Sequence, residues 1–242
     1  MRYLPPALAI GVAAVVSALI LSYTYLNRYA HQDTIEVIGL GSKDFKSDLI
    51  VWRASFSRKA PTIKEAYALL DEDRALVMAF LQEQAVKKEE FVFSPIAISK
   101  DFVYSYDDRG RQYSTFNGYV LSQTLTIESK RVDAVEDIMR NITGLIQRGL
   151  EVVSYEPEYY YTKLSELKIQ MIAEATKDAR LRAEKIAQEA GASLGKLKGA
   201  RMGVFQITAQ NSNEDYSWGG AFNTSSKMKT ASITMRLTFE VD

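Results

Sequence analysis

Four alanines recur at every fourth position in the longest amphipathic stretch of the chain, which predicts a helix from about Lys163 to Ala190. They are Ala175, Ala179, Ala183 and Ala187. Residues four apart lie on the same face of a helix, and small side chains on that face let another helix or a sheet approach closely. The fold must therefore supply a partner surface for this helix, which we expect to end at Gly191.

The end of the chain alternates between apolar and polar residues, which predicts a strand with one buried and one solvated face. Its apolar positions are Ala231, Ile233, Met235, Leu237, Phe239 and Val241. A sheet with one wet face is typical of antiparallel strands. The same alternation over Leu49–Ser57 places Ile50, Trp52, Ala54 and Phe56 on one face.

Two further helices and a long hairpin complete the expected elements. One helix opens at Pro61, and the other carries apolar residues from Val132 to Ile146 and ends at Gly149. Residues 107–110 have turn composition and join two long strands. The expected strands are Ile35–Gly39, Leu49–Ser57, Phe91–Tyr106, Tyr113–Glu128, Glu151–Tyr161, Arg201–Gln210 and Ala231–Val241, with a polar loop over Asn211–Ser226. This order predicts an α+β fold in which antiparallel hairpins are covered by three main helices.

The N-terminal segment has the pattern of a membrane helix. Ala7–Leu26 contains no charged residue, and its length fits the roughly 20 helical residues that cross a bilayer. We therefore predict a signal-anchor or transmembrane helix in residues 1–30 and a soluble domain in residues 31–242. A cleaved signal peptide is the alternative, although its apolar region normally runs about 7–15 residues and ends at a small-x-small site.

The residue inventory excludes many catalytic and metal-binding classes. The 242 residues include no cysteine, so disulfides, zinc–thiolate sites, iron–sulfur clusters and cysteine nucleophiles are ruled out. The single histidine, His31, is expected to be a solvated linker residue. Thirty basic residues balance 30 acidic ones, which argues against nucleic-acid binding. We expect no catalytic residues, no cofactor and no metal.

Three local patterns allow a functional and a plain interpretation. Gly39-Leu40-Gly41 lacks the further residues of a phosphate loop, which favours a turn or bulge. Asp107 and Asp108 offer too few oxygen ligands for calcium. Glu156 and Glu158 could act as an acid/base pair if they shared a pocket, but turn or rim positions also account for them.

Tyrosines form the most unusual local pattern of the chain. Strand alternation places Tyr159 and Tyr161 on one face and Tyr160 on the other. Exposed tyrosines on a strand edge make good protein contacts, whereas the alternative is that they cap the core where strand meets helix. The long hairpin also carries Tyr104 and Tyr106, which we predict to be protein-contact residues.

Several short motifs resemble the SIMPL domain family, also known as DUF541. Ile35-Glu-Val-Ile-Gly-Leu-Gly41 resembles its opening strand, and Thr62-Ile-Lys-Glu-Ala66 resembles the head of its first helix. The alanine-spaced helix from Ala175 to Ala187, followed by Ala190-Gly-Ala-Ser-Leu-Gly-Lys196, is the most specific part. The resemblance extends over about Thr34 to Val241.

This resemblance implies a bacterial cell-envelope protein, periplasmic or membrane-anchored, with no known catalytic residues. The family includes a periplasmic oxidative-stress-defence protein and an immunogen that builds ring-like, channel-like oligomers. We accordingly predict a non-enzymatic protein anchored in the inner membrane by a single helix, with its domain in the periplasm, that forms homo-oligomers and contacts other envelope proteins, with a link to envelope or oxidative stress. The alternatives are an envelope enzyme that acts on glycans or peptides through carboxylates, and a carrier of small ligands or lipids.

Overall fold

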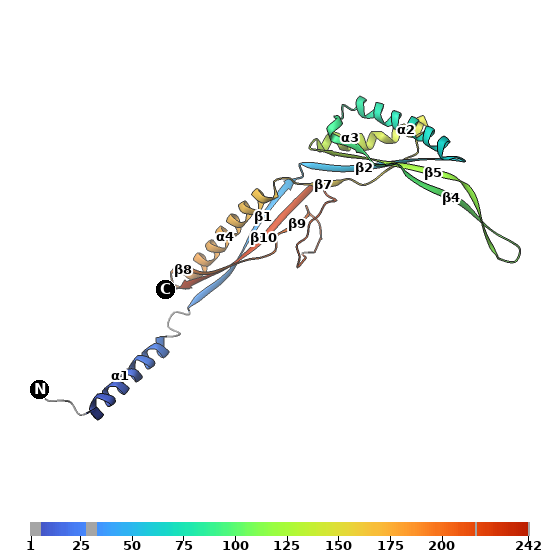
Figure 1. The fold of residues 1–242 in the computed structure, drawn as a ribbon. Helices are drawn as coiled ribbons and strands as arrows, with labels where there is room; N and C mark the ends of the chain where they lie inside the picture. Colours follow the sequence, from blue (N-terminus) through green and yellow to red (C-terminus); the bar gives the residue numbers. More distant parts are fainter. Residues whose placement is uncertain (1–5, 28–32, 216, 242) are drawn as a thin grey trace.

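The computed structural model describes residues 6–27, 33–215 and 217–241. His31 lies outside these residues. The part after α1 (Pro6–Asn27) is elongated and consists of two lobes, each with its own antiparallel sheet (Figure 1). The predicted α+β class with antiparallel strands is therefore confirmed.

The terminal lobe joins the two ends of the folded chain. Its sheet pairs β1 (Thr34–Lys46) with β10 (Met228–Val241), and β10 pairs on its other side with β8 (Leu194–Met202) and β9 (Gln206–Ala209). The helix α4 (Leu164–Glu189) covers one face of this sheet. Apolar residues of β10, among them Ile233 and Leu237, are buried there, as the alternation predicts.

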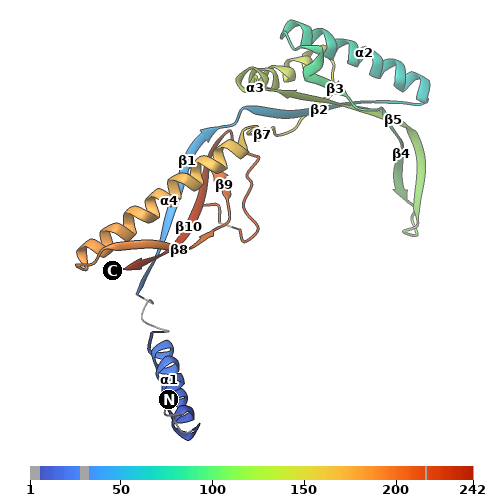
Figure 2. The same cartoon turned by 60° about the vertical axis from the view of Figure 1, so that its left-hand side comes forward.

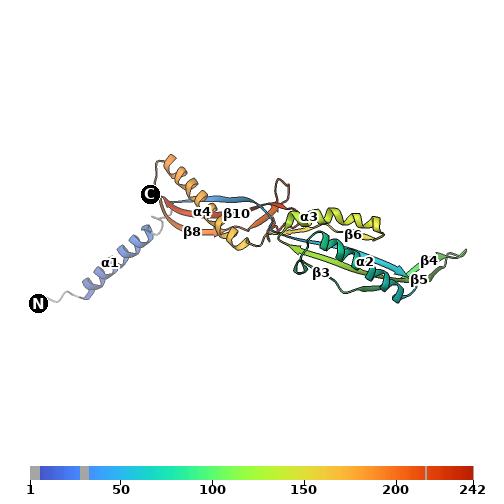
Figure 3. The same ribbon diagram turned by 90° about the horizontal axis from the view of Figure 1, so that it is seen from above.

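The central lobe is built from the intervening residues. Its sheet contains six strands: β2 (Leu49–Ala60), β3 (Phe91–Phe93), β4 (Ala97–Tyr106), β5 (Gln112–Ser129), β6 (Val152–Ser154) and β7 (Glu158–Tyr160). One face of the sheet is covered by α2 (Ile63–Glu83) and α3 (Val132–Asn141), which lie side by side when seen from above (Figure 3). Trp52 and Phe56 from β2 lie in this core. Two short 3₁₀ turns, Lys88–Glu90 and Ile142–Arg148, complete the lobe.

The alanine row of α4 packs directly on β1. Ala175 and Ala179 are completely buried, and the matching surface is the strand around Gly39 and Gly41. A Cβ atom on Gly39 would lie 2.1 Å from the Ala175 carbonyl oxygen, and one on Gly41 would lie 2.5 Å from the Met171 carbonyl oxygen. The expectation of a turn or bulge at these glycines is wrong, because they continue β1 and allow the helix backbone to approach.

Prolines and glycines account for other differences from the expected elements. The strand expected over Phe91–Tyr106 is divided into β3 and β4 at Pro95, and the strand expected over Glu151–Tyr161 is divided into β6 and β7 at Pro157. Proline cannot donate to a sheet ladder, so it interrupts both strands. The helix after Val132 changes to a 3₁₀ turn at Ile142 and ends at Gly149, which adopts the left-handed conformation with φ of 85°.

The N-terminal segment is helical over Pro6–Asn27, as the sequence predicts. Among the described residues, however, no helix combines the length and the apolar character needed to cross a membrane. The predicted transmembrane helix is therefore not confirmed.

Candidate protein-contact site

A hairpin arm projects from the central lobe beyond its helices (Figure 2). It consists of residues 101–106 of β4 and the facing residues 112–118 of β5, and β4 pairs only with β5 among the described strands. Nearly all of its residues are exposed to solvent. Its exposed apolar side chains are Phe102, Val103, Tyr104, Tyr106, Tyr113 and Phe116.

Aromatic side chains lie along the arm on both of its faces. Phe102 pairs with Phe116 across the strands, with ring centroids 6.0 Å apart in an edge-on arrangement. Tyr104 and Tyr106 continue the same face toward the tip and are 61% and 69% exposed. Tyr113 lies opposite Ser105 on the other face. The predicted contact residues Tyr104 and Tyr106 are thus solvent-facing side chains of a two-stranded ribbon.

The tip of the arm is ordered by one carboxylate. Asp107 accepts hydrogen bonds from the backbone N–H groups of Arg109 at 2.9 Å and Arg111 at 2.8 Å, and from the Tyr113 hydroxyl at 3.0 Å. These bonds, led by the backbone N–H of Arg111, hold the pKa of Asp107 below its ordinary value. Asp107 therefore stabilises the turn at the tip of the arm.

The root of the arm contains a bend. Gly118 has φ of 111°, and a Cβ atom there would lie 2.6 Å from the Ala60 carbonyl oxygen. On the facing strand, the β4–β5 register shifts between Lys100 and Phe102, and Asp101 accepts a 2.7 Å hydrogen bond from Asn117 and an ion pair from Lys59. A glycine with positive φ beside a shifted register redirects a hairpin, which explains why the arm leaves the plane of the sheet.

The second tyrosine group lies elsewhere. The strand β7 pairs with Leu49–Val51 at one end of β2, whereas the arm begins beyond Ala60 at the other end. Tyr159 is only 8% exposed, and its hydroxyl donates to Glu136 at 2.8 Å. Burial and the nearby Glu136 carboxylate raise the pKa of Tyr159 to about 12. Tyr159 thus packs in the core of the central lobe.

Tyr160 and Tyr161 are partly buried, and each contacts a neighbouring side chain. The Tyr160 hydroxyl donates to Glu158 at 2.6 Å, while the Tyr161 ring lies 4.8 Å from that of Phe45 in the terminal lobe. The tyrosines of β7 and its flank thus have different surroundings, with Tyr159 in the core of the central lobe and Tyr161 against the core of the terminal lobe. All three lie apart from Tyr104 and Tyr106. Of these two tyrosine groups, only the one on the arm is exposed to solvent.

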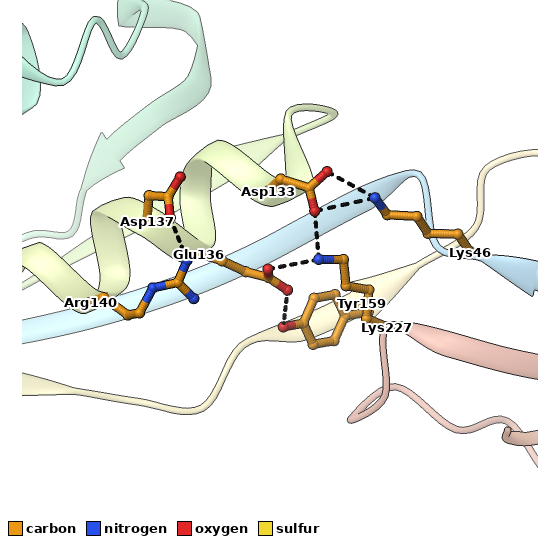
Figure 4. A network of polar contacts seen from close by, with 7 residues as sticks. All are labelled: Lys46, Asp133, Glu136, Asp137, Arg140, Tyr159 and Lys227. Atoms are coloured by element: carbon orange, nitrogen blue, oxygen red, sulfur yellow. Dashed lines mark hydrogen bonds and ion pairs between the residues drawn. The ribbon is translucent and has the colours of Figure 1, made fainter. Parts of the chain in front are cut away.

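An ionic network joins the two lobes near Tyr159 (Figure 4). Lys46 and Lys227 belong to the terminal lobe, whereas Asp133 and Glu136 lie on α3 of the central lobe. The Lys227 ammonium lies 2.5 Å from Asp133 and 2.7 Å from Glu136, and Lys46 lies 2.8 Å from Asp133. These ammonium groups, Lys227 first, lower the pKa of Asp133 to about 2.

Backbone bonds reinforce this contact between the lobes. The Ser47 N–H donates to the Lys227 carbonyl at 2.9 Å, and the Tyr159 N–H donates to the Thr224 carbonyl at 2.7 Å. Sequence patterns do not indicate this network, because its members come from three distant parts of the chain. No local pattern could have identified it.

The carboxylates considered for catalysis do not form a shared site. Glu158 pairs with Arg53 at 3.1 Å and accepts from Tyr160, which lowers its pKa, while Glu156 is exposed. Neither residue lines the cavity beside Trp218 or the cavity beside Glu90. Within the described residues, no cluster of histidine and carboxylate side chains could hold a metal ion.

A comparison with protein families identifies the family to which this chain belongs. Residues 35–241 match the profile of the family described as "SIMPL: Protein of unknown function (DUF541)". The chain belongs to this family. The expected resemblance is thereby confirmed over both lobes of this SIMPL protein.

Two curated relatives also match the SIMPL protein. They are the proteins named "26 kDa periplasmic immunogenic protein" of Brucella melitensis biotype 1 and of Brucella abortus. Each is 25% identical over 166 residues, which covers 67% of this chain and 64% of the relative. The match thus spans slightly less than two thirds of the length of these relatives. Neither the family description nor the relatives' names specify an enzymatic activity.

Proposed function

We propose that this SIMPL protein is a non-enzymatic protein of the bacterial periplasm that self-associates through its hairpin arm. The observation that carries the proposal is the arm itself, with six apolar side chains exposed on a two-stranded ribbon. An isolated two-stranded hairpin is marginally stable in water. The arm therefore gains stability when a further surface covers it.

A second copy of the arm is a suitable cover for geometric reasons. Among the described strands, β4 has one unpaired edge, and residues 112–118 of β5 have another because β2 pairs only from Tyr119 onward. Unpaired edges are templates for pairing with another chain. Two arms can thus add strands to each other while their aromatic rings pack together.

The aromatic side chains supply the driving force for association. Fully burying an exposed phenylalanine side chain is worth about 1.5–3 kcal/mol, and covering Phe102, which is 40% exposed in the single chain, gives a fraction of this. Phe102, Tyr104, Tyr106 and Phe116 lie along one face of each arm. Aromatic residues are also enriched in the centres of protein interfaces.

The location is proposed from the relatives and from the N-terminal helix. The names of the Brucella relatives specify the periplasm. In this chain, the described side chains of α1, including Ile10, Leu19 and Ile20, are exposed and apolar. We infer that α1 holds the protein at the membrane. If the protein still partitions to membranes after α1 is deleted, this part of the proposal is contradicted.

Light scattering on the full chain in mild detergent tests the self-association. The variant combining Tyr104→Ser and Tyr106→Ser should lower the average mass of the particles, while its melting temperature stays within about 2 °C of the original because both side chains lie outside the cores. Tyr67→Ser is the matched control, because Tyr67 is 51% exposed and belongs to α2 rather than to the arm. An unchanged mass for the arm variant would refute the assignment of the arm as the interface.

A further inference from the structure

Trp218 is fully exposed, although tryptophan carries the largest apolar side chain. It lies in the loop between β9 and β10, beside a cavity of about 430 Å³. The cavity is lined by Val204, Gln206, Ser217, Trp218, Ser232, Ile233 and Thr234. Nothing in the proposed assembly through the arm uses this site, which lies in the other lobe.

The turn that presents Trp218 is held by a buried amide. Gln206, which is 7% exposed, donates to the Ser217 carbonyl at 2.8 Å and accepts from the Ala221 N–H at 2.5 Å. The turn closes with a 3.0 Å hydrogen bond from the Gly220 N–H to the Ser217 carbonyl, and Gly220 supplies the positive φ of 96°. The backbone that carries the exposed ring is thus held in place before any contact is made, which lowers the entropy cost of ordering the loop on binding.

The floor of the cavity is the face of the terminal sheet that α4 leaves open. Ile233 and its neighbours Ala231 and Met235 belong to the core with α4, so the intervening Ser232 and Thr234 point to the opposite face. Among the described residues, neither the Ser232 nor the Thr234 hydroxyl has a hydrogen-bonding partner, which leaves both available to a ligand.

The chemistry of the lining selects against charged ligands. It contains no acidic or basic side chain, so an anion or a cation would lose its hydration without an opposing charge. It also disfavours a purely apolar ligand, because the Ser232 hydroxyl is nearly buried and a covered hydroxyl needs a partner. A matching ligand is neutral, has an apolar face for Trp218 and carries hydroxyl groups.

We propose that Trp218 and the adjoining cavity form a binding site for a neutral sugar ring of a glycan. A pyranose ring has a face of C–H groups that stacks on an indole, and its equatorial hydroxyls both donate and accept hydrogen bonds. The indole of Trp218 provides the stacking surface, and the hydroxyls of Ser232 and Thr234 bind the ring's polar edge. The cavity volume is within the range of about 300–1,000 Å³ found for small-molecule sites.

The two tryptophans make this site directly measurable on the full chain. Trp52 is completely buried in the central lobe, whereas Trp218 is fully exposed, so iodide should quench only Trp218 fluorescence. Titration with chitotriose or maltotriose, both neutral, should give saturable protection of Trp218 from iodide. Failure of both sugars to protect it at tens of millimolar would overturn the proposal.

Two variants identify the residues responsible without removing the reporter. Ser232→Ala combined with Thr234→Val should weaken binding of the protective sugar at least tenfold. Thr238→Val is the matched control, because Thr238 lies on the same face of β10 but outside the cavity lining, and it should leave the affinity unchanged. Equal affinities for the double variant and the control would overturn the site.

The same measurement separates this site from self-association. If iodide fails to quench Trp218 before any sugar is added, and quenching appears only when the protein is diluted, a second copy covers the ring and the proposal is wrong. Mass measurements on the arm variant address the arm separately, so either proposal can fail without the other.

Discussion

Replacing Gly39 by alanine should destabilise the terminal lobe while leaving the central lobe intact. The added methyl group would lie 2.1 Å from the Ala175 carbonyl oxygen and 2.4 Å from the Ala179 nitrogen. Both are backbone atoms of α4, so no side-chain rotation relieves the contact. The helix must instead move away from β1.

The size of the effect follows from these distances. An unstrained contact of about 3.5 Å requires α4 to move by roughly 1.4 Å. That movement loosens the contacts of the buried alanine row and stretches the 2.8 Å hydrogen bond from the Leu40 N–H to Asp178. Overpacked cores lose about 1–3 kcal/mol, and we expect a loss of about 3 kcal/mol because the obstacle is a helix backbone.

Thermal unfolding and amide hydrogen exchange measure this prediction. Gly39→Ala should lower the melting temperature of the terminal lobe by more than about 10 °C, with faster exchange in β10 and unchanged exchange in β5. Gly144→Ala is the control, because nothing lies within 4 Å of a Cβ atom at Gly144. If the two variants have the same stability, the packing argument is refuted. If Gly39→Ala changes hydrogen exchange equally in both lobes, the lobes do not unfold independently.

Three further predictions concern buried polar groups. Asp73→Ala should reduce the free energy of unfolding, measured by urea denaturation, by about 3 kcal/mol. This is the lower end of the cost of breaking a buried ion pair, because the Arg58 side chain that loses its partner is 30% exposed. Tyr159→Phe should cost about 1 kcal/mol in the same assay, because Glu136 loses one donor. Burial lowers the pKa of Lys229 from 10.5 to about 8, so the folded chain releases this proton before the unfolded chain does. The free energy of unfolding of the original chain, measured relative to that of the Lys229→Met variant, should therefore rise between about pH 8 and 10.5. If this difference does not change with pH, the burial of the ammonium is contradicted.

Regular patterns predicted the elements with buried faces. The alanine row from Ala175 to Ala187 correctly indicated close packing, and the alternation in β10 correctly indicated a one-sided sheet. The expectation of a sheet or helix against this row was correct, but the expectation of a turn or bulge at the glycine pair was wrong, because a glycine pair has the same pattern in a turn as in a strand under a helix. Gly39 and Gly41 show that only the opposing helix distinguishes the two.

Sites built from distant residues could not be predicted in the same way. Lys46, Asp133 and Lys227 meet only after both lobes have formed, and each is an ordinary charged residue in its own segment. The strand β8 was missed because its three lysine and arginine residues and its glycines give no apolar alternation. Trp218 lies in a loop predicted to be polar, and the proposed role of its side chain depends on the adjacent cavity, which is lined by residues of β10.

The pairing of β1 with β10 constrains the order in which the chain acquires its structure. Thr34 pairs with Glu240, so the first strand has no ladder partner until the last strand has been synthesised. Residues 49–160, by contrast, contain every strand of the central sheet and a complete core. During synthesis on the ribosome, the central lobe should therefore fold before β1 can pair with β10. Contacts between residues so distant in the sequence also form slowly. A chain truncated before Met228 should retain one folded half and expose an orphan strand to aggregation.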